Sequence, residues 1–88
     1  MLEQRIAFIG AILEEPEAVQ AEFNAVVSSF RSILRGRSGT PFLEDVAVIS
    51  LVVMGTVDEI NALTGRLGQI PHVQVKSAIS KKKFESPE

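Results

Sequence analysis

The most apolar stretch of the chain is Val46–Gly55. Both alternating sets of its side chains are apolar, and many of them are β-branched. Successive side chains of a β-strand point to opposite faces of a sheet, so a strand that is apolar on both faces belongs in the interior of the sheet. The pattern therefore predicts a central strand here. Gln4–Leu13 is predicted to be a second one, and Gly10 interrupts its row of side chains, which indicates a bulge or a close backbone approach.

Two shorter segments have strand patterns with more polar residues. Ser32–Arg37 contains Arg35 and Arg37, and charged side chains on a strand discourage edge-to-edge aggregation. Val73–Ser80 alternates apolar and polar positions, as a strand with one solvated face does. We therefore predict that these two strands form the edges of the sheet.

Two segments repeat apolar residues with the 3.6-residue period of a helix. The first starts near Pro16, which suits the first turn because the missing N–H of proline has no helical partner there, and it extends to about Phe30. The second begins with the capping-box sequence Thr56–Glu59 and extends to about Gln69. The predicted apolar stripes are Val19, Phe23, Val26, Val27 and Phe30 in the first helix and Val57, Ile60, Leu63, Leu67 and Ile70 in the second.

The predicted element order is β-α-β-β-α-β within residues 1–80, a single domain. Residues 81–88 are polar, and we expect them to form a disordered tail. The order fits an α+β domain with the ferredoxin-like fold, which has a four-stranded antiparallel sheet and two helices on one face. In this fold the first and third strands are central and the other two lie at the edges.

The predicted fold leaves one face of the sheet without a helix layer. Both central strands are apolar on both faces, and large exposed apolar patches are unusual on monomers. The hydrophobic content of 45% is also high for so small a chain. We therefore expect a homo-oligomer formed through the open sheet face or the edge strands. The alternative is that small residues such as Ala7, Ala11 and Ala47 tolerate exposure.

Composition excludes several classes of function. The chain has 88 residues and a formal net charge of −2, which does not fit a protein that binds nucleic acid directly. It has no cysteine, which excludes disulfides, thiolate nucleophiles and cysteine-ligated clusters within the chain. Since no stretch reaches the roughly 18 apolar residues of a transmembrane helix, we expect a soluble, cytoplasmic protein without membrane contact.

Candidate metal ligands are few. His72 is the only histidine, and because a metal site needs several converging ligands, a surface turn residue is the simpler interpretation. Glu14, Glu15 and Glu17 could hold a hard cation, although compensation of a helix dipole already explains an acidic cluster at a helix start. Lys81–Lys83 is too short a basic run to indicate nucleic-acid binding. No metal or other cofactor is predicted.

The most suggestive polar segment is Arg35–Pro41. Two arginines and the backbone N–H groups of a glycine-containing loop could hold an anion. The segment is not a phosphate-binding P-loop, since the pattern GxxxxGK[ST] is absent. The alternative interpretation is a charged edge strand followed by a turn. No G-x-S-x-G elbow accompanies the serines of the chain, and we predict no catalytic residues.

Four motifs resemble those of one known family. They are GRSGTP at Gly36–Pro41, VISL at Val48–Leu51, GTVDEINALTGRLG at Gly55–Gly68 and IPHVQVKSA at Ile70–Ala78. These motifs are similar to the family of proposed regulators of the iron-only hydrogenase system, and the similarity extends over about Arg5–Lys81. Members of that family look like ACT domains and are related in fold to the ligand-sensing domain of the nickel-responsive repressor.

The resemblance implies a non-catalytic regulatory domain that has no DNA-binding element and no metal site. The nickel-sensing relatives use histidines and a cysteine, and this chain has one histidine and no cysteine. A small effector bound at a subunit interface is expected, with Arg37, Gly39, Thr40, Ser50 and Thr64 as the predicted ligand-binding residues. The alternative is a protein-interaction or scaffold subunit that binds a larger enzyme and has no small-molecule ligand. A small enzyme, the third possibility, requires a cleft with converging titratable groups.

Overall fold

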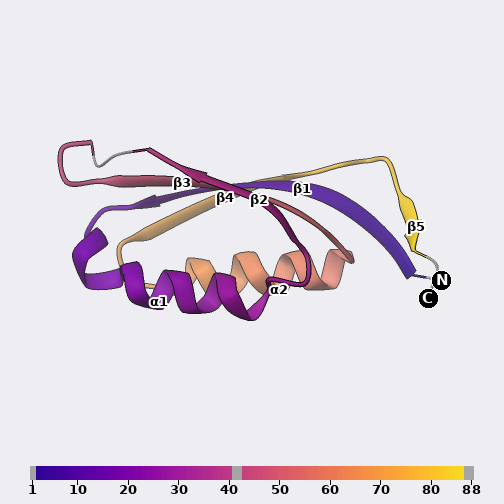
Figure 1. Ribbon diagram of the computed structural model, residues 1–88, viewed down its shortest axis with the longest axis horizontal. Helices are drawn as coiled ribbons and strands as arrows, with labels where there is room; N and C mark the ends of the chain where they lie inside the picture. The colour runs from indigo at the N-terminus through magenta and orange to yellow at the C-terminus, as the bar shows by residue number, and fades with distance from the viewer. Residues whose placement is uncertain (1, 41–42, 87–88) are drawn as a thin grey trace.

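The computed structural model describes residues 2–40 and 43–86. Its main sheet has the antiparallel strand order β2-β3-β1-β4, so the two predicted central strands are central (Figure 1). The elements along the chain are β1 (Leu2–Leu13), α1 (Pro16–Ser29), β2 (Leu34–Gly39), β3 (Ala47–Gly55), α2 (Val57–Gly68), β4 (Val73–Ile79) and β5 (Phe84–Ser86).

Both helices lie against the same face of the sheet, as the fold prediction requires (Figure 1). Over Ala7–Leu13 of β1 and throughout β3, the side chains that point toward the helices are buried, and those that point away are exposed or half-buried. Ala7, Ala11 and Ala47 are among the buried ones, each at most 5% exposed. These small residues therefore lie beneath the helices and do not form the open face.

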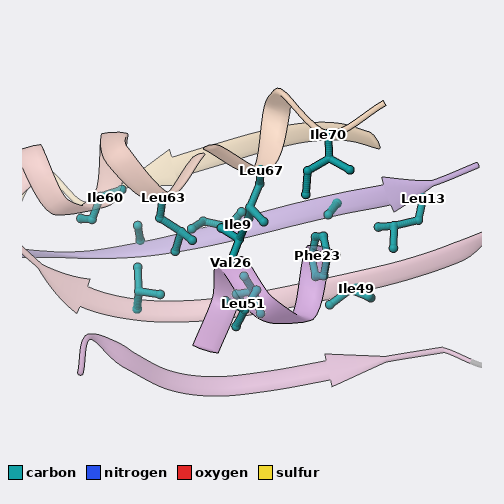
Figure 2. Packing of buried hydrophobic residues seen from close by; sticks show 14 of the residues in the cluster. Ile9, Leu13, Phe23, Val26, Ile49, Leu51, Ile60, Leu63, Leu67 and Ile70 are labelled. Atoms are coloured by element: carbon teal, nitrogen blue, oxygen red, sulfur yellow. The ribbon is translucent and has the colours of Figure 1, made fainter. Parts of the chain in front are cut away.

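The core is a layer of aliphatic side chains around one aromatic ring (Figure 2). Phe23 of α1 is fully buried, and Leu63 and Leu67 of α2 are at most 1% exposed. Each fully buried side chain of this size contributes roughly 1.5–3 kcal/mol relative to an exposed one, so the two helical stripes hold the helices to the sheet. Val57 departs from the predicted stripe, because it is 36% exposed at the first turn of α2.

The second helix begins with the predicted capping box. The Oγ1 atom of Thr56 accepts a hydrogen bond from the backbone N–H of Glu59 (3.1 Å). The Oε1 atom of Glu59 in turn accepts one from the backbone N–H of Thr56 (2.8 Å). The first N–H groups of a helix have no partner within the helix, and these reciprocal bonds satisfy two donors at its start.

The edge strand β2 starts two residues later than predicted and ends two residues later. The chain leaves α1 through consecutive tight turns, in which the N–H of Ile33 donates to the carbonyl of Phe30 (3.0 Å) and that of Leu34 to the carbonyl of Arg31 (3.2 Å). These turns occupy the N–H groups of Ile33 and Leu34, while the Ile33 carbonyl already accepts a hydrogen bond from the N–H of Met54 in β3 (2.8 Å), and the paired strand begins at Leu34. The register between β2 and β3 shifts between Leu34 and Gly36, and the pairing then continues to Gly39.

Residues 84–86 form a strand where the sequence analysis expects a disordered tail. Strand β5 pairs with residues 2–4 of β1, which begins at Leu2 and not at the predicted Gln4 (Figure 1). Residues 2–4 of β1 extend past the end of β3, so their backbone groups are available for another partner. A three-residue strand of this kind depends on its distant pairing partner and has almost no signal of its own in the sequence. Residues 87–88 lie outside the described part.

No bulge occurs at Gly10. Its registers with Ser50 of β3 and with Lys76 of β4 both belong to uninterrupted runs. Gly10 instead leaves an open position on the sheet face that points away from the helices, where an added Cβ would meet only the Phe8 ring, at 3.9 Å. None of the helices described here is long and apolar enough to cross a membrane.

Candidate functional site

A hollow of about 190 Å³ lies between the first helix and the edge of the sheet. Its floor consists of apolar side chains on the helix-facing side of β1 and β3, and its rim consists of polar residues of α1, β2 and the segment after β2. The lining residues are Leu13, Gln20, Arg37, Gly39, Thr40, Ala47 and Ile49. Three of the five predicted ligand-binding residues, Arg37, Gly39 and Thr40, therefore come together here.

Arg37 is held in place from two sides. Its guanidinium carbon lies 5.8 Å from the centroid of the Phe23 ring, and its Nη2 atom donates to Oδ1 of Asn24 (2.7 Å). A guanidinium stacks on aromatic faces and presents five N–H donors. Within the described residues, the Asn24 contact uses one N–H donor of Arg37. Its other N–H donors remain available to a ligand at the rim.

The electrostatics of the hollow favour an anion. Its lining contains one cationic side chain, Arg37, and no carboxylate among the described residues. Arg37 lies above a floor that includes Leu13, Ala47 and Ile49, which are at most 8% exposed. Apolar surface beside a fixed cation fits a small anionic molecule with an apolar part.

The other two predicted ligand-binding residues lie elsewhere. Ser50 points to the open face of the sheet, where its Oγ lies 2.7 Å from Oγ of Ser38. Thr64 lies on α2, and its Oγ1 atom donates to the carbonyl oxygen of Asn61 (3.2 Å). Neither lines the hollow. Gln20 does, and sequence reasoning missed it, because only the packing of α1 on the sheet brings it beside β2.

A second hollow, of about 340 Å³, is lined by Glu14, Glu15, Pro16, Glu17 and Asp45. Glu14, Glu15 and Glu17 are the residues considered above as ligands of a hard cation, and Asp45 joins them here. Glu14 already accepts a hydrogen bond at Oε2 from Nε2 of Gln74 (2.7 Å), and Glu17 lies in the first turn of α1. Among residues 2–40 and 43–86, no group of three or more acidic, histidine or cysteine side chains converges as metal ligands.

His72 occupies an exposed turn, in keeping with its interpretation as a surface turn residue. Its backbone is in the left-handed region, with φ at 66°, and its carbonyl oxygen accepts a hydrogen bond from the N–H of Glu14 (2.8 Å). This bond joins the end of β1 to the turn before β4. The residue therefore has a backbone role in closing the sheet at that end.

The comparison with protein families gives one match. Residues 5–77 match the TM1266-like family, described as proposed regulators of the iron-only hydrogenase system. The chain belongs to this family. A search among curated proteins gave no match.

Comparison with solved structures identifies proteins that share the fold of this chain. The uncharacterized protein TM1266 from Thermotoga maritima is 33% identical, with a TM-score of 0.83, and the alignment covers 89% of this chain and 99% of that one. The C-terminal domain of MgtC from Mycobacterium tuberculosis is 18% identical (TM-score 0.68, 88% of each chain). The ACT domain of GTP pyrophosphokinase from Chlorobium tepidum is 16% identical (TM-score 0.60, 90% of this chain and 89% of that one). The predicted ferredoxin-like, ACT-like fold is thus confirmed.

Proposed function

We propose that this TM1266-like chain is a non-catalytic regulatory domain, acting in the cytoplasm, that binds a small anionic effector in the hollow beside β2. The observation that carries the proposal is the position of Arg37, a fixed cation at the rim of an apolar floor. A hollow of about 190 Å³ has room for a short carboxylate or a phosphate-sized anion. The membership of the chain in a family of proposed regulators supports the regulatory part.

The position of the hollow suggests how binding would be transmitted. Arg37 lies on an edge strand and donates to Asn24 of α1, so an anion at Arg37 competes with or reinforces the contact between strand and helix. All the residues that line the hollow come from one chain, so the proposed effector site does not require a second subunit. The nickel-sensing relatives suggested by the sequence would then share a sensing role but not a metal.

The test is a thermal-shift and calorimetric screen with short aliphatic monocarboxylates, inorganic phosphate, amino acids and divalent metals. We expect an anion to raise the melting temperature, since a ligand at a hundredfold excess over Kd adds about 2.7 kcal/mol to the unfolding free energy. Arg37→Gln should abolish the shift. Arg35→Gln is the matched control, because Arg35 lies on the same strand but donates to the carbonyls of Ser32 and Leu34.

An effector that binds the Arg37→Gln and Thr40→Ala variants as tightly as the parent would exclude this site. Metal-dependent stabilisation without any response to anions would also contradict the proposal. Loss of binding in the Arg35→Gln variant as well would indicate a diffuse effect of charge and no specific site.

The second candidate function is a protein-interaction subunit that binds a larger enzyme. The exposed apolar side chains on the open sheet face favour it, because such surfaces mark interaction sites. A protein of this kind should be stabilised by its protein partner and by none of the small molecules in the screen. A catalytic role is the third candidate, and the exposed position of His72, the only histidine, gives it little support.

A further inference from the structure

The sheet face opposite the helices carries most of the exposed large apolar side chains. Phe8 is 54% exposed, Ile6 40%, Val52 39% and Ile12 38%. They lie on the two central strands, where the registers place Phe8 beside Val52 and Ile12 beside Val48. This open face is thus continuous and apolar at its centre.

A narrow polar row crosses the middle of the open face. The registers place Ser38, Ser50, Gly10 and Lys76 side by side on the four strands. The two serine hydroxyls lie 2.7 Å apart and bond to each other, and Gly10 has no side chain. Each hydroxyl therefore keeps a partner when the face is covered, so burial does not leave it unsatisfied.

The size of the open face suits a protein partner. The paired parts of β1 and β3 have nine residues each, β4 has seven and β2 has six. With strands spaced by about 4.8 Å and residues rising about 3.3 Å each, the flat area is about 490 Å², and the corrugated surface of the side chains is larger. Stable interfaces bury about 600–1,000 Å² per partner, so covering this face reaches the lower part of that range.

The charge distribution favours a second copy of this chain as the occupant. Lys76 of β4 is charged on the open face, and the Glu14 carboxylate reaches the end of that face, where it accepts a hydrogen bond from Gln74, the register partner of Ile12. Both charges lie at the margin of an apolar centre, which leaves that centre free to meet a copy of itself, whereas charge complementarity is what steers a protein to a foreign partner.

We propose that two copies pack open face to open face about a two-fold axis that runs parallel to the central strands, midway between β1 and β3. This arrangement places β1 of each copy over β3 of the other, so Phe8 meets Val52 of the second copy and Ile12 meets its Val48. The two Lys76 side chains then lie at opposite edges and do not repel each other. The proposal selects the sheet face over the edge strands and is independent of the effector site, which lies on the helix side.

The test is sedimentation equilibrium of the full chain from about 0.5 to 200 µM. We expect the mass to move from one chain of 9.6 kDa to two as the concentration rises. Phe8→Glu should raise the dimer dissociation constant at least about tenfold, since a buried unpaired carboxylate is strongly disfavoured. Leu43→Glu is the matched control, because Leu43 is 57% exposed and lies in the loop after β2. Circular dichroism checks the fold of both variants.

A thiol probe provides a second measurement that does not depend on the folding of the Phe8→Glu variant. The chain has no cysteine, so Ser50→Cys introduces a single thiol on the open face and Asn61→Cys a single one on the exposed side of α2. We expect maleimide labelling to slow with rising protein concentration in the first variant only. A monomer throughout, or a dimer that persists in Phe8→Glu and leaves both thiols equally reactive, would overturn the proposal. The second result would assign the contact to the strand edges.

Discussion

Two glycines of this chain have opposite surroundings. Gly55 ends β3 beside the capping box, and a Cβ there would lie 2.8 Å from Oε1 of Glu59 and 2.9 Å from Cγ2 of the buried Ile33. Gly65 lies inside α2, and nothing stands within 4 Å of its Cβ position. A methyl group is therefore excluded at the first position by packing and accepted at the second.

We predict that Gly55→Ala lowers the free energy of unfolding by about 1–3 kcal/mol, the usual cost of overpacking. The displaced Glu59 carboxylate would also lose its bond to the cap residue. Gly65→Ala, the control, should raise the free energy by up to about 1 kcal/mol, because alanine is the better helix former. Urea unfolding of both variants measures the two changes. Equal effects of the same sign would contradict this account of Gly55.

The register between β2 and β3 explains why the predicted ligand-binding residues do not all lie in one site. Arg37 pairs with Leu51 and Ser38 pairs with Ser50, so Arg37 and Ser50 point to opposite faces of the sheet. The sequence identifies the polar residues of β2 and β3 but not the register between these strands, and one position of register decides the face. Ser50 could therefore not be separated from the Arg37 group before the strand pairing was known.

At the level of elements, the start of α2 is fixed by a side chain that the sequence identifies directly. The Thr56 hydroxyl accepts the N–H of Glu59, and the spacing of the two residues is local. The N-cap of α1, by contrast, is Glu15, which makes no side-chain capping bond. The second helix therefore depends on its cap more than the first does.

We predict that Thr56→Ala lowers the free energy of unfolding by about 1 kcal/mol, the typical value for loss of an N-cap. Thr64→Ala is the control within the same helix, since its hydroxyl bonds only to the Asn61 carbonyl one turn earlier. It should leave the stability unchanged or slightly raised, because alanine has the higher helix propensity. Equal losses in the two variants, measured by thermal unfolding, would show that the cap has no special role.

The elements could be predicted from the sequence to the extent that their signals are local. The central strands follow from their continuous apolar sequence and both helices from apolar periodicity, which is why their cores agree with the structure. The limits of β2 depend on turns after α1, and β5 depends on pairing with residues 2–4 of β1. The turns are local but their segment also has a strand-like sequence, whereas the pairing of β5 arises only from a contact between segments far apart in the chain.

At the level of the whole molecule, the structure has an unequal distribution of contacts along its long axis. The middle of β1 has a strand on each side and helices beneath it, whereas residues 2–4 of β1 pair with β5 alone. The ribbon of β1 and β5 extends past α2 at one end of the molecule (Figure 1). An isolated two-stranded ribbon is marginally stable in water.

We predict that the ribbon opens far more often than the main sheet. The amides of residues 2–4 that bond to β5 should exchange with solvent through local opening, while those of Ala7–Leu13 exchange only through global unfolding. Native-state hydrogen exchange by NMR measures both. Phe84→Ala should accelerate exchange in the ribbon and leave the protection of Ala7–Leu13 unchanged. Equal protection of the two segments would contradict a separately opening ribbon.

The central place of β1 in the sheet has a consequence for how the chain folds. Ala7 aligns with Val53 on one side and with Ile79 on the other, and both lie far along the chain. The earliest strand therefore cannot acquire its neighbours by closing short loops, and chains dominated by such distant contacts fold slowly. The hairpin of β2 and β3 joins consecutive segments and can form early. The apolar segment of β1 therefore stays unpaired until this later part of the chain has formed.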